Sequence, residues 1–478
     1  MALVDNIYES RELIEQDREG APSLDLPDIE VEKYFRPADR GNYLLFYASV
    51  KKNVLPGICP CCKSDEHWKR AGNGRHRLIH DMERNNCRVD IVLLPKRFEC
   101  KQCGLKTTPP LRGIEERRQM TTRLLEFLQK ECLLQSHTVL AQRSGFTVET
   151  IQNIMDEEIE KFEAQRIANP LLAPRVLGID EKHITHKMRG TLVDVESGRL
   201  LNMLESNNAQ TMQNAIQQLK EWDNRIKVVT VDMNNAYIRW LPELLPNAVI
   251  VIDKFHVIQD VQKRISATKS ELYEYRKKLI KGVEDAEERV RQRGILNIVD
   301  KHPRLFNYSM ETVIQSEKSE MALQLSTVMD EFPEFKLLRA LYYAIETMYQ
   351  KETYEEALEA WEEWMNLLPP SGDKRYQEWC DLYSVIPPLF DSFRSFQRTG
   401  FQRFKPYILN YFKPGCRVTN AATEGVNTLI ERINRDAHGL SFKSLRAKSL
   451  YASLIGERKR YGIDLSTIKS WAPISEHI

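Results

Sequence analysis

The chain has 478 residues, of which 42% are hydrophobic and 29% are charged, and its formal net charge is +1. These values are typical of a soluble globular protein of about two to four domains. No apolar run reaches about 18 residues and the N-terminus lacks the apolar stretch of a signal peptide, so we expect a cytoplasmic protein without a membrane-spanning helix.

The charge is unevenly distributed along the chain. Residues 1–32 contain ten acidic side chains and two basic ones, whereas residues 59–112 contain twelve Lys or Arg and six Asp or Glu. Residues 432–460 contain eight basic and two acidic side chains. Basic blocks of this kind indicate contacts with nucleic acid, although solvated basic surfaces would give the same pattern.

Four cysteines form two C-x-x-C pairs, Cys59 with Cys62 and Cys100 with Cys103. Clustered cysteines in a cytosolic protein favour a metal ion over disulfides. Each pair can supply two ligands of a tetrahedral ion, so the pattern predicts a structural Zn²⁺ in a zinc ribbon. Two alternatives stay open: the thiols are simply buried, or Cys61 replaces one of its neighbours as a ligand.

The segment between the two pairs has room for a β-hairpin, and DIVLLPKRFEC is predicted to be a strand that leads into the second pair. This region is also rich in arginine, which predicts contacts with phosphates. The candidates are Arg70, Arg75, Arg77, Arg84, Arg88 and Arg97.

Residues 117–165 have a helical pattern, and SHTVLAQRSGFTVETIQNIMDEEIEKF has the rhythm of a helix-turn-helix. The turn is expected at Ser144-Gly145-Phe146. Thr147 is predicted to cap a second helix whose inward face carries Val148, Ile151 and Ile154. An ordinary helical hairpin would give the same pattern.

After Asn169-Pro170 the pattern changes to three predicted strands, VLGIDEKHI, GTLVDVESG and RLLNMLES. Helix, strand, helix and strand follow, as NNAQTMQNAIQQLKEW, IKVVTVD, NAYIRWLPELL and AVIVID. Three consecutive strands indicate an antiparallel meander, and the later strands would extend the sheet in parallel. The order predicts a ribonuclease H-like core, followed by largely helical residues from 260 to 400.

Two aspartates occupy strands that are neighbours in such a sheet. Asp180 lies in the first strand and Asp232 ends the fourth. Adjacent carboxylates repel each other unless a cation lies between them, and Mg²⁺ prefers such oxygen ligands. Glu424, near the start of a helix that Thr419 or Asn420 would cap, is the best third ligand of a two-metal site. Glu181 and Glu431 are the alternatives for this third position.

Five segments together resemble the bacterial ISL-three family of DDE transposases, from about residue 59 to residue 455. They are CPCCKSDEHW…RFECKQCG, VLGIDEKHI, VTVDMNNAY, AVIVIDKFHVI and NAATEGVNTLIERINRDAHGLSFKSLRAKSL. The resemblance implies a triad of Asp180, Asp232 and Glu424. It also implies an accessory pair, Asp253 and His256, which match a C/D-x-x-H element.

The resemblance further implies a multidomain α/β protein with a zinc ribbon, a helix-turn-helix, and a ribonuclease H-like core interrupted by an all-helical insertion. We therefore expect an acidic segment at 1–50, a zinc-binding domain at 51–115, a helix-turn-helix domain at 116–168, the first part of the core at 169–262, the insertion at 263–412 and the C-terminal core helices at 413–478.

The implied function is that of a transposase which binds the terminal inverted repeats of an insertion sequence in double-stranded DNA. Strand cleavage and strand transfer would use Mg²⁺ or Mn²⁺, and Zn²⁺ would be structural. We expect a homodimer or larger assembly on DNA, associated with the nucleoid when bound. Arg432, Arg435 and Lys443 are candidate contacts with the DNA backbone.

Two other functions stay open. A metal-dependent, structure-selective DNA nuclease on the same fold would cut without joining. A non-catalytic zinc-ribbon regulator would only bind DNA, although the intact Asp, Asp and Glu count against it.

Overall fold

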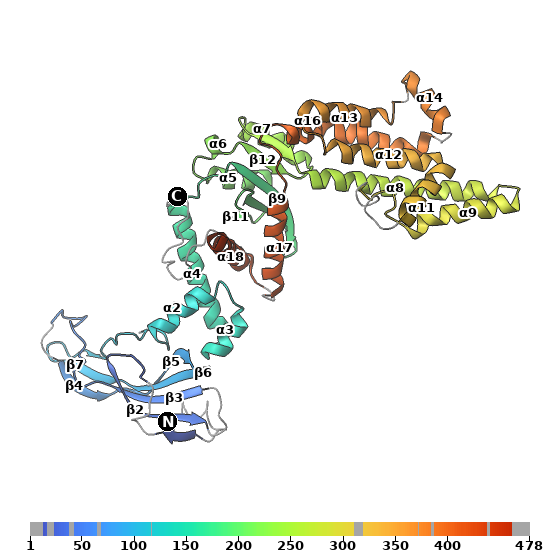
Figure 1. The fold of residues 1–478 in the computed structure, drawn as a ribbon. Coiled ribbons are helices and arrows are strands. Elements are labelled where there is room, and N and C mark those ends of the chain that lie inside the picture. Colours follow the sequence, from blue (N-terminus) through green and yellow to red (C-terminus); the bar gives the residue numbers. More distant parts are fainter. Residues whose placement is uncertain are drawn as a thin grey trace. The chain divides into compact units, whose positions relative to one another are not determined.

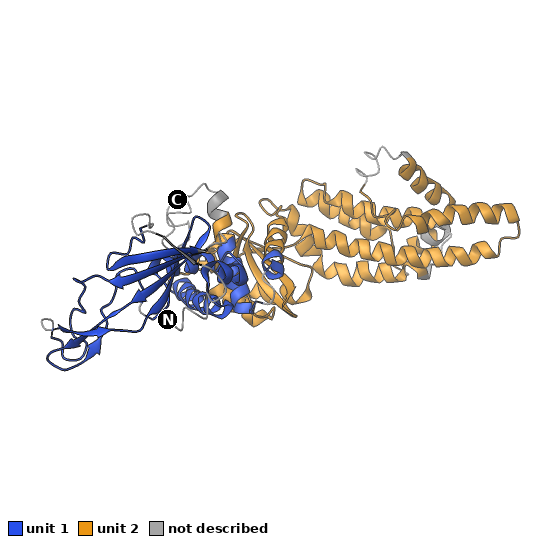
Figure 2. Ribbon diagram, turned by 90° about the horizontal axis from the view of Figure 1, so that it is seen from below, with its two compact units in different colours: residues 1–168, 432–452 blue, residues 169–431, 453–478 orange. Residues whose placement is uncertain are grey.

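The computed structural model describes residues 13–16, 23–37, 43–64, 68–115, 117–309, 319–370, 372–383, 387–436 and 440–460. The chain divides into two compact units, coloured separately in Figure 2. Unit 1 comprises residues 1–168 and 432–452, and unit 2 comprises residues 169–431 and 453–478. Among the described residues, no helix is both long enough and apolar enough to span a membrane.

Unit 1 contains two sheets (Figure 1), with strand orders β1-β2-β3-β6-β5 and β4-β7-β8. Their strands are β1 (Leu13–Gln16), β2 (Ile29–Pro37), β3 (Tyr43–Val50), β4 (Trp68–Asn73), β5 (Arg77–Arg84), β6 (Cys87–Leu94), β7 (Lys96–Cys100) and β8 (Lys106–Thr107). Asn85 and Asn86 both have positive φ and form the tight turn of the β5–β6 hairpin. The predicted hairpin is therefore confirmed.

The prediction of one strand over DIVLLPKRFEC is wrong, because the chain changes sheets in the middle of it. β6 ends at Leu94 and β7 begins at Lys96. Pro95, between them, has no N–H to donate to a ladder, so it marks the break. β3 also pairs with β6. One sheet therefore contains strands from both the predicted acidic segment, 1–50, and the predicted zinc-binding domain, 51–115. The domain boundaries stay predictions.

The helices of unit 1 follow the predicted rhythm. They are α2 (Thr122–Glu131), α3 (His137–Ser144), α4 (Val148–Ala168) and most of α18 (Phe442–Arg460). Gly145 ends α3 with φ of 77°. Thr147 Oγ1 accepts a hydrogen bond from the N–H of Thr150 at 3.2 Å, which confirms the predicted cap. Ile151 and Ile154 are buried, but Val148 is 47% exposed, so its predicted inward position is wrong. The buried face of α4 begins one turn after the helix does.

A buried lysine fastens α18 to the end of α2. Lys448 Nζ donates to the carbonyl oxygens of Cys132 at 2.6 Å and of Gln135 at 2.7 Å. Carbonyl groups at a helix C-terminus have no partner within the helix, and a cationic side chain satisfies them well. This contact links the C-terminal part of the chain to the helical layer of unit 1.

Unit 2 is built on a five-stranded sheet of order β11-β10-β9-β12-β13. Its strands are β9 (Val176–Ile184), β10 (Lys187–Asp194), β11 (Arg199–Met203), β12 (Val228–Val231) and β13 (Val249–Ile252). The first three are antiparallel neighbours, and β12 pairs in parallel with both β9 and β13. Both features of the predicted topology are confirmed, and the mixed α/β sheet fits a ribonuclease H-like core.

Helices cover this sheet and extend beyond it (Figure 1). Between the strands lie α5 (Ala209–Gln217), α6 (Trp222–Arg225) and α7 (Asn235–Leu244). The described residues from 254 to 412 form helices only: α8 (Lys254–Lys281), α9 (Ala286–Lys301), α11 (Ser319–Glu331), α12 (Pro333–Met348), α13 (Tyr354–Asn366), α14 (Lys374–Tyr383), η2 (Pro387–Phe390), α15 (Asp391–Ser395), η3 (Phe396–Phe401), η4 (Gln402–Phe404), α16 (Lys405–Leu409) and η5 (Asn410–Phe412). One apolar core runs from the sheet into these helices. The helix α17 (Ala421–Asp436) follows them.

Candidate functional site

Three aspartates lie at the same level of three adjacent strands. The parallel register pairs Thr230 of β12 with Gly178 of β9, and Val231 of β12 with Ile252 of β13. Continued along the strands, this register puts Asp232 beside Asp180 on one side and beside Asp253 on the other. The carboxyl ends of these strands therefore gather three acidic side chains, which repel one another in the absence of a cation.

The helix α17 runs along β9, and their residues meet at matching intervals. Positions 178, 180 and 182 of the strand face positions 423, 427 and 431 of the helix. Two strand residues rise about 6.6 Å and four helix residues about 6 Å, so the contacts stay in step. Asn427 Nδ2 donates a hydrogen bond to Asp180 Oδ2. α17 is thereby fixed against the strand that carries the first aspartate.

Glu424 lies one helical turn before Asn427, on the neighbouring part of the same helix surface. It is exposed, and within the described part of the chain its carboxylate has no hydrogen bond or ion pair. Among the described residues, the carboxylate oxygens of Glu424, Asp180 and Asp232 do not all lie within 4.8 Å of one another. The structure thus brings the two aspartates together and places Glu424 on the adjoining helix.

The two alternatives to Glu424 are engaged elsewhere. Glu431 Oε1 lies 2.6 Å from Lys182 Nζ in an ion pair. Glu181 follows Asp180 in the strand, so its side chain points to the opposite face of the sheet. There it accepts a hydrogen bond from the hydroxyl of Tyr237 at 2.8 Å.

His256 and Asp253 both lie at this end of the sheet. His256 Nε2 is 2.9 Å from Asp232 Oδ1. Burial alone would lower the pKa of His256, but the carboxylate of Asp232 outweighs it and raises that pKa above its usual value. Asp253 is 2% exposed and accepts a hydrogen bond from the N–H of Asn420 at 3.2 Å. The carboxylate of Asp253 therefore fixes the start of α17, and the imidazole of His256 fixes the carboxylate of Asp232.

Burial, together with the charge of Asp232, raises the pKa of Asp180 to about 6. Between about pH 4 and pH 6 the Asp180 carboxyl therefore holds its proton more often in the folded, metal-free chain than in the unfolded chain, so this group makes stability fall as the pH rises through that window. A divalent ion held by this carboxylate would have to displace the proton below about pH 6.

We therefore expect the apparent affinity for Mg²⁺ to fall about tenfold for each pH unit below about 6 and to be constant above about pH 7. Calorimetric titration at several pH values measures this slope. In Asp180→Asn, which should bind the ion more weakly because it lacks a proposed ligand, the remaining affinity should show no such slope. An unchanged slope in that variant would assign the proton to another group.

At Gly178 the backbone of β9 passes close to α17. A Cβ at this position would lie 2.6 Å from Thr423 Oγ1 and 2.9 Å from Val195 Cγ2. Gly178→Ala should therefore displace α17 and lower the free energy of unfolding by about 1–3 kcal/mol. It should also slow the DNA cleavage that the resemblance implies, because Glu424 and Asn427 move with the helix.

Chemical denaturation and a cleavage assay test this expectation. Gly425→Ala, on α17 itself, is the matched control because nothing lies within 4 Å of its added Cβ. The double variant Gly178→Ala/Thr423→Ala should recover part of the loss. If Gly178→Ala behaves like Gly425→Ala, the close approach has no functional role.

The structure brings the four predicted cysteines together in unit 1. The ligand atoms of Cys59, Cys62, Cys100 and Cys103 all lie within 4.8 Å of one another, and among the described residues only these form such a group. Cys61 is exposed and lies outside the group. Four thiols at this spacing are compatible with a structural zinc ion.

Both cysteine pairs form the same turn. The N–H of Lys63 donates to the Cys59 carbonyl at 2.9 Å, and the N–H of Gly104 donates to the Cys100 carbonyl at 2.8 Å. Lys63 and Gly104 both have positive φ. Backbone N–H groups, chiefly that of Cys62, lower the pKa of the Cys59 thiol to about 7. The N–H of Cys103 likewise lowers the pKa of Cys100. One thiol of each turn is thus prepared to ionise, whereas burial and the neighbouring thiols raise the pKa of Cys62 and of Cys103.

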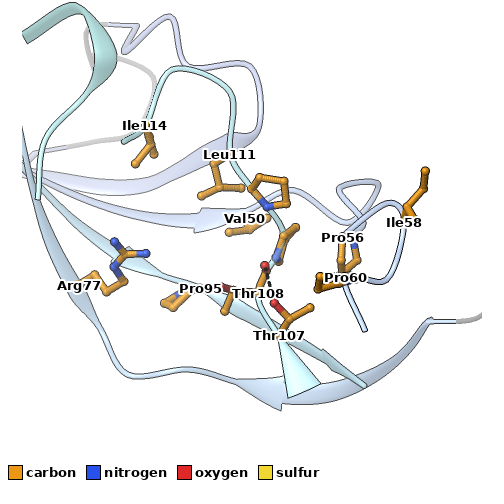
Figure 3. A pocket seen from close by; sticks show the side chains of 12 residues that line it. Val50, Pro56, Ile58, Pro60, Arg77, Pro95, Thr107, Thr108, Leu111 and Ile114 are labelled. Carbon is orange, nitrogen blue, oxygen red and sulfur yellow. Dashed lines mark hydrogen bonds between the residues drawn. The ribbon is translucent and has the colours of Figure 1, made fainter. Parts of the chain in front are cut away.

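A hollow of about 430 Å³ lies beside the first cysteine turn (Figure 3). Its lining is rich in proline, and Arg77 and Ile58 lie on opposite sides of the view. All of its lining residues belong to unit 1. The hollow is therefore no part of the carboxylate site.

The predicted DNA contacts fall into two groups. Arg84 is 3.7 Å from Asp25, and Arg88 is 2.6 Å from Asp90, so both are used in ion pairs. Arg77 is half-buried. The exposed candidates are Arg70, Arg75, Arg97, Arg432, Arg435 and Lys443. Lys443 lies 3.8 Å from Glu160 and is 51% exposed.

Asn427, Gly178 and the partners of Glu181 belong to this site but are not among the residues predicted from the sequence. A glycine inside a buried strand is a known sign of close backbone approach, so Gly178 carried a usable signal. Asn427 carried none, because an asparagine in an amphipathic helix is ordinary.

Comparison with known proteins agrees with this geometry. A family model described as Transposase, for the DDE type of the ISL3 (ISL-three) group, matches residues 177–449. The chain is also similar to the transposase for insertion sequence element IS1001 of Bordetella parapertussis, with 23% identity over 432 residues, which cover 86% of this chain and 91% of that protein.

Proposed function

Because this chain belongs to the ISL3 family of DDE transposases and is a DNA transposase, we propose that Asp180, Asp232 and Glu424 hold the divalent ions of its reaction. DNA binding and cleavage, and the use of divalent metal, follow from the family. The choice of Mg²⁺ or Mn²⁺ and the identity of the three ligands are parts of the proposal.

The observation that carries the proposal is the pair of aspartates on adjacent parallel strands. Asp180 is 9% exposed and interacts with the charge of Asp232, so its ionised form is costly without a cation. Carboxylate oxygens in this arrangement are the donors that Mg²⁺ prefers. α17 adds Glu424 from one side, and that exposed side chain would have to turn toward the aspartates to complete the donor set.

Divalent ions on such carboxylates supply an activated water and neutralise the leaving oxygen in phosphoryl transfer. The protein's own residues provide the positions. Asn427 orients the carboxylate of Asp180, and His256 orients that of Asp232. Asp253 fixes the start of α17 through the N–H of Asn420. The same carboxylates would serve both strand cleavage and the attack of the freed 3′-hydroxyl on target DNA.

We propose that unit 1 recognises the terminal inverted repeats of the element. The zinc-bound turns on Cys59, Cys62, Cys100 and Cys103 and the α3–α4 pair would contact double-stranded DNA, chiefly at phosphates. Exposed basic side chains support this role, namely Arg75, Arg97, Arg432, Arg435 and Lys443. Two ends must be paired for transposition, so we propose a homodimer or larger assembly on DNA.

Labelled DNA that spans the flanks of the gene tests this proposal. The purified chain with Mg²⁺ or Mn²⁺ should protect and cut a defined end and join it to a second DNA. Cutting that is never followed by joining would favour the structure-selective nuclease. Binding that is equal for the natural and a scrambled end would contradict recognition of the inverted repeats.

A further inference from the structure

Glu181 follows Asp180 in the chain but lies on the other face of the sheet. Its carboxylate accepts three hydrogen bonds: from Asn207 Nδ2 at 2.6 Å, from the Tyr237 hydroxyl at 2.8 Å and from Asn234 Nδ2 at 3.3 Å. All three donors are neutral, and Tyr237 is 1% exposed. Within the described part of the chain, this half-buried carboxylate near two further acidic groups therefore has only neutral hydrogen-bond donors.

The three donors come from two helix starts. Asn234 begins α7, and its Oδ1 accepts a hydrogen bond from the N–H of Ala236 at 2.9 Å. The N–H of Asn234 in turn donates to the carbonyl oxygen of Asp232 at 2.8 Å. Asn207 directly precedes Asn208, the N-cap of α5. Glu181 therefore connects the end of β9 to the turn that follows Asp232 and to the start of α5.

The hydrogen bonds of Glu181 affect the distance between Asp180 and Asp232. Asp180 and Glu181 are successive residues, so any movement of one carries the other. Asn234 lies two residues after Asp232 in a tight turn. Through Asn234, the Glu181 side chain thus links the turn of Asp232 to β9, while the backbone N–H of Glu181 donates a hydrogen bond to Asp180 Oδ1 at 2.7 Å. Positive helix ends at α5 and α7 favour its negative charge.

We propose that Glu181 is a positioning residue of the carboxylate site, which holds Asp180 and Asp232 at a fixed separation through Asn234 and Tyr237. The inference rests on the proposed function, since the fixed separation matters only if these aspartates share a divalent ion. Groups of this kind behind metal ligands typically change metal affinity or activity by about 10- to 100-fold when removed.

The test uses the full chain and four variants: Glu181→Ala, Glu181→Gln, Tyr237→Phe and Asp180→Asn. In the metal-free chain, amide hydrogen exchange of residues 232–237 should become about tenfold faster or more in Glu181→Ala. Tyr237→Phe, which removes one hydrogen bond and keeps the ring, should give a smaller increase. Glu181→Gln keeps the shape and should stay within about threefold of wild type.

Mn²⁺ binding by calorimetry provides the second measurement. Glu181→Ala should weaken it about 10- to 100-fold, and Glu181→Gln should restore most of the loss. Unchanged exchange and unchanged Mn²⁺ affinity in Glu181→Ala would overturn the inference. If Glu181→Gln loses Mn²⁺ as fully as Asp180→Asn, Glu181 is a ligand and the positioning role is wrong. If Asp180→Asn binds Mn²⁺ normally, the proposed function fails, and the exchange rates still decide whether Glu181 fixes the turn.

Discussion

Replacing Glu424 by glutamine is expected to lower the rates of DNA strand cleavage and strand transfer by roughly 10³-fold, with binding of the element ends unchanged. The side chain keeps its shape and loses the charge that would help hold the ions, and such ions contribute several kcal/mol to the stabilisation of phosphoryl-transfer transition states. Asp180→Asn and Asp232→Asn should have effects of the same order. Single-turnover cleavage and joining assays measure them.

Glu431→Gln is the matched control for Glu424→Gln. It lies on the same helix and undergoes the same change of charge, but its partner is Lys182. We expect its cleavage rate to stay within about threefold of wild type, as for most exposed ion pairs. If instead Glu431→Gln is inactive and Glu424→Gln is active, the third ligand has been assigned to the wrong residue.

Cys100→Ser is expected to release zinc and to abolish specific DNA binding while leaving unit 2 folded. Structural zinc contributes about 10–16 kcal/mol to the folding of small zinc-binding modules, more than the three-stranded sheet β4-β7-β8 can replace by packing. A zinc-release assay and DNA-binding titrations test this.

The exposed Cys61 offers the control for this experiment. Cys61→Ser should retain one zinc ion per chain and wild-type DNA affinity. Specific binding that survives in Cys100→Ser would show that the zinc module is not needed for recognition. Loss of zinc from Cys61→Ser would mean that it replaces one of the four thiols.

Much of the carboxylate site could be predicted because it depends on strand order. Alternation of apolar strands and helices indicated that the strands of Asp180 and Asp232 are neighbours, and the register confirms it. The C-x-x-C spacing likewise identified the four cysteines that meet in space. Each of these patterns can be recognised within short stretches of sequence, in the apolar periodicity of single strands and helices or in the spacing of two cysteines.

Contacts that depend on how elements approach one another could not be predicted. The pairing of Asn427 with Asp180 requires the path of α17 along β9, which joins residues 247 positions apart. The break at Pro95 was missed because strand-favouring residues lie on both sides of it, an apolar run up to Leu94 before it and Phe98 after it. Val148 was placed inward because periodicity alone does not say where packing against other helices begins.

The measurement that tests the central claim most directly is metal-directed cleavage of the protein backbone. Fe²⁺ replaces Mg²⁺ at carboxylate sites and, with ascorbate and peroxide, generates radicals that cut nearby peptide bonds. Mass spectrometry of the fragments should locate cuts close to Asp180, Asp232 and Glu424, all suppressed by excess Mg²⁺. Cuts near the two aspartates with none near Glu424, or cuts concentrated near Glu431, would contradict the three-carboxylate site.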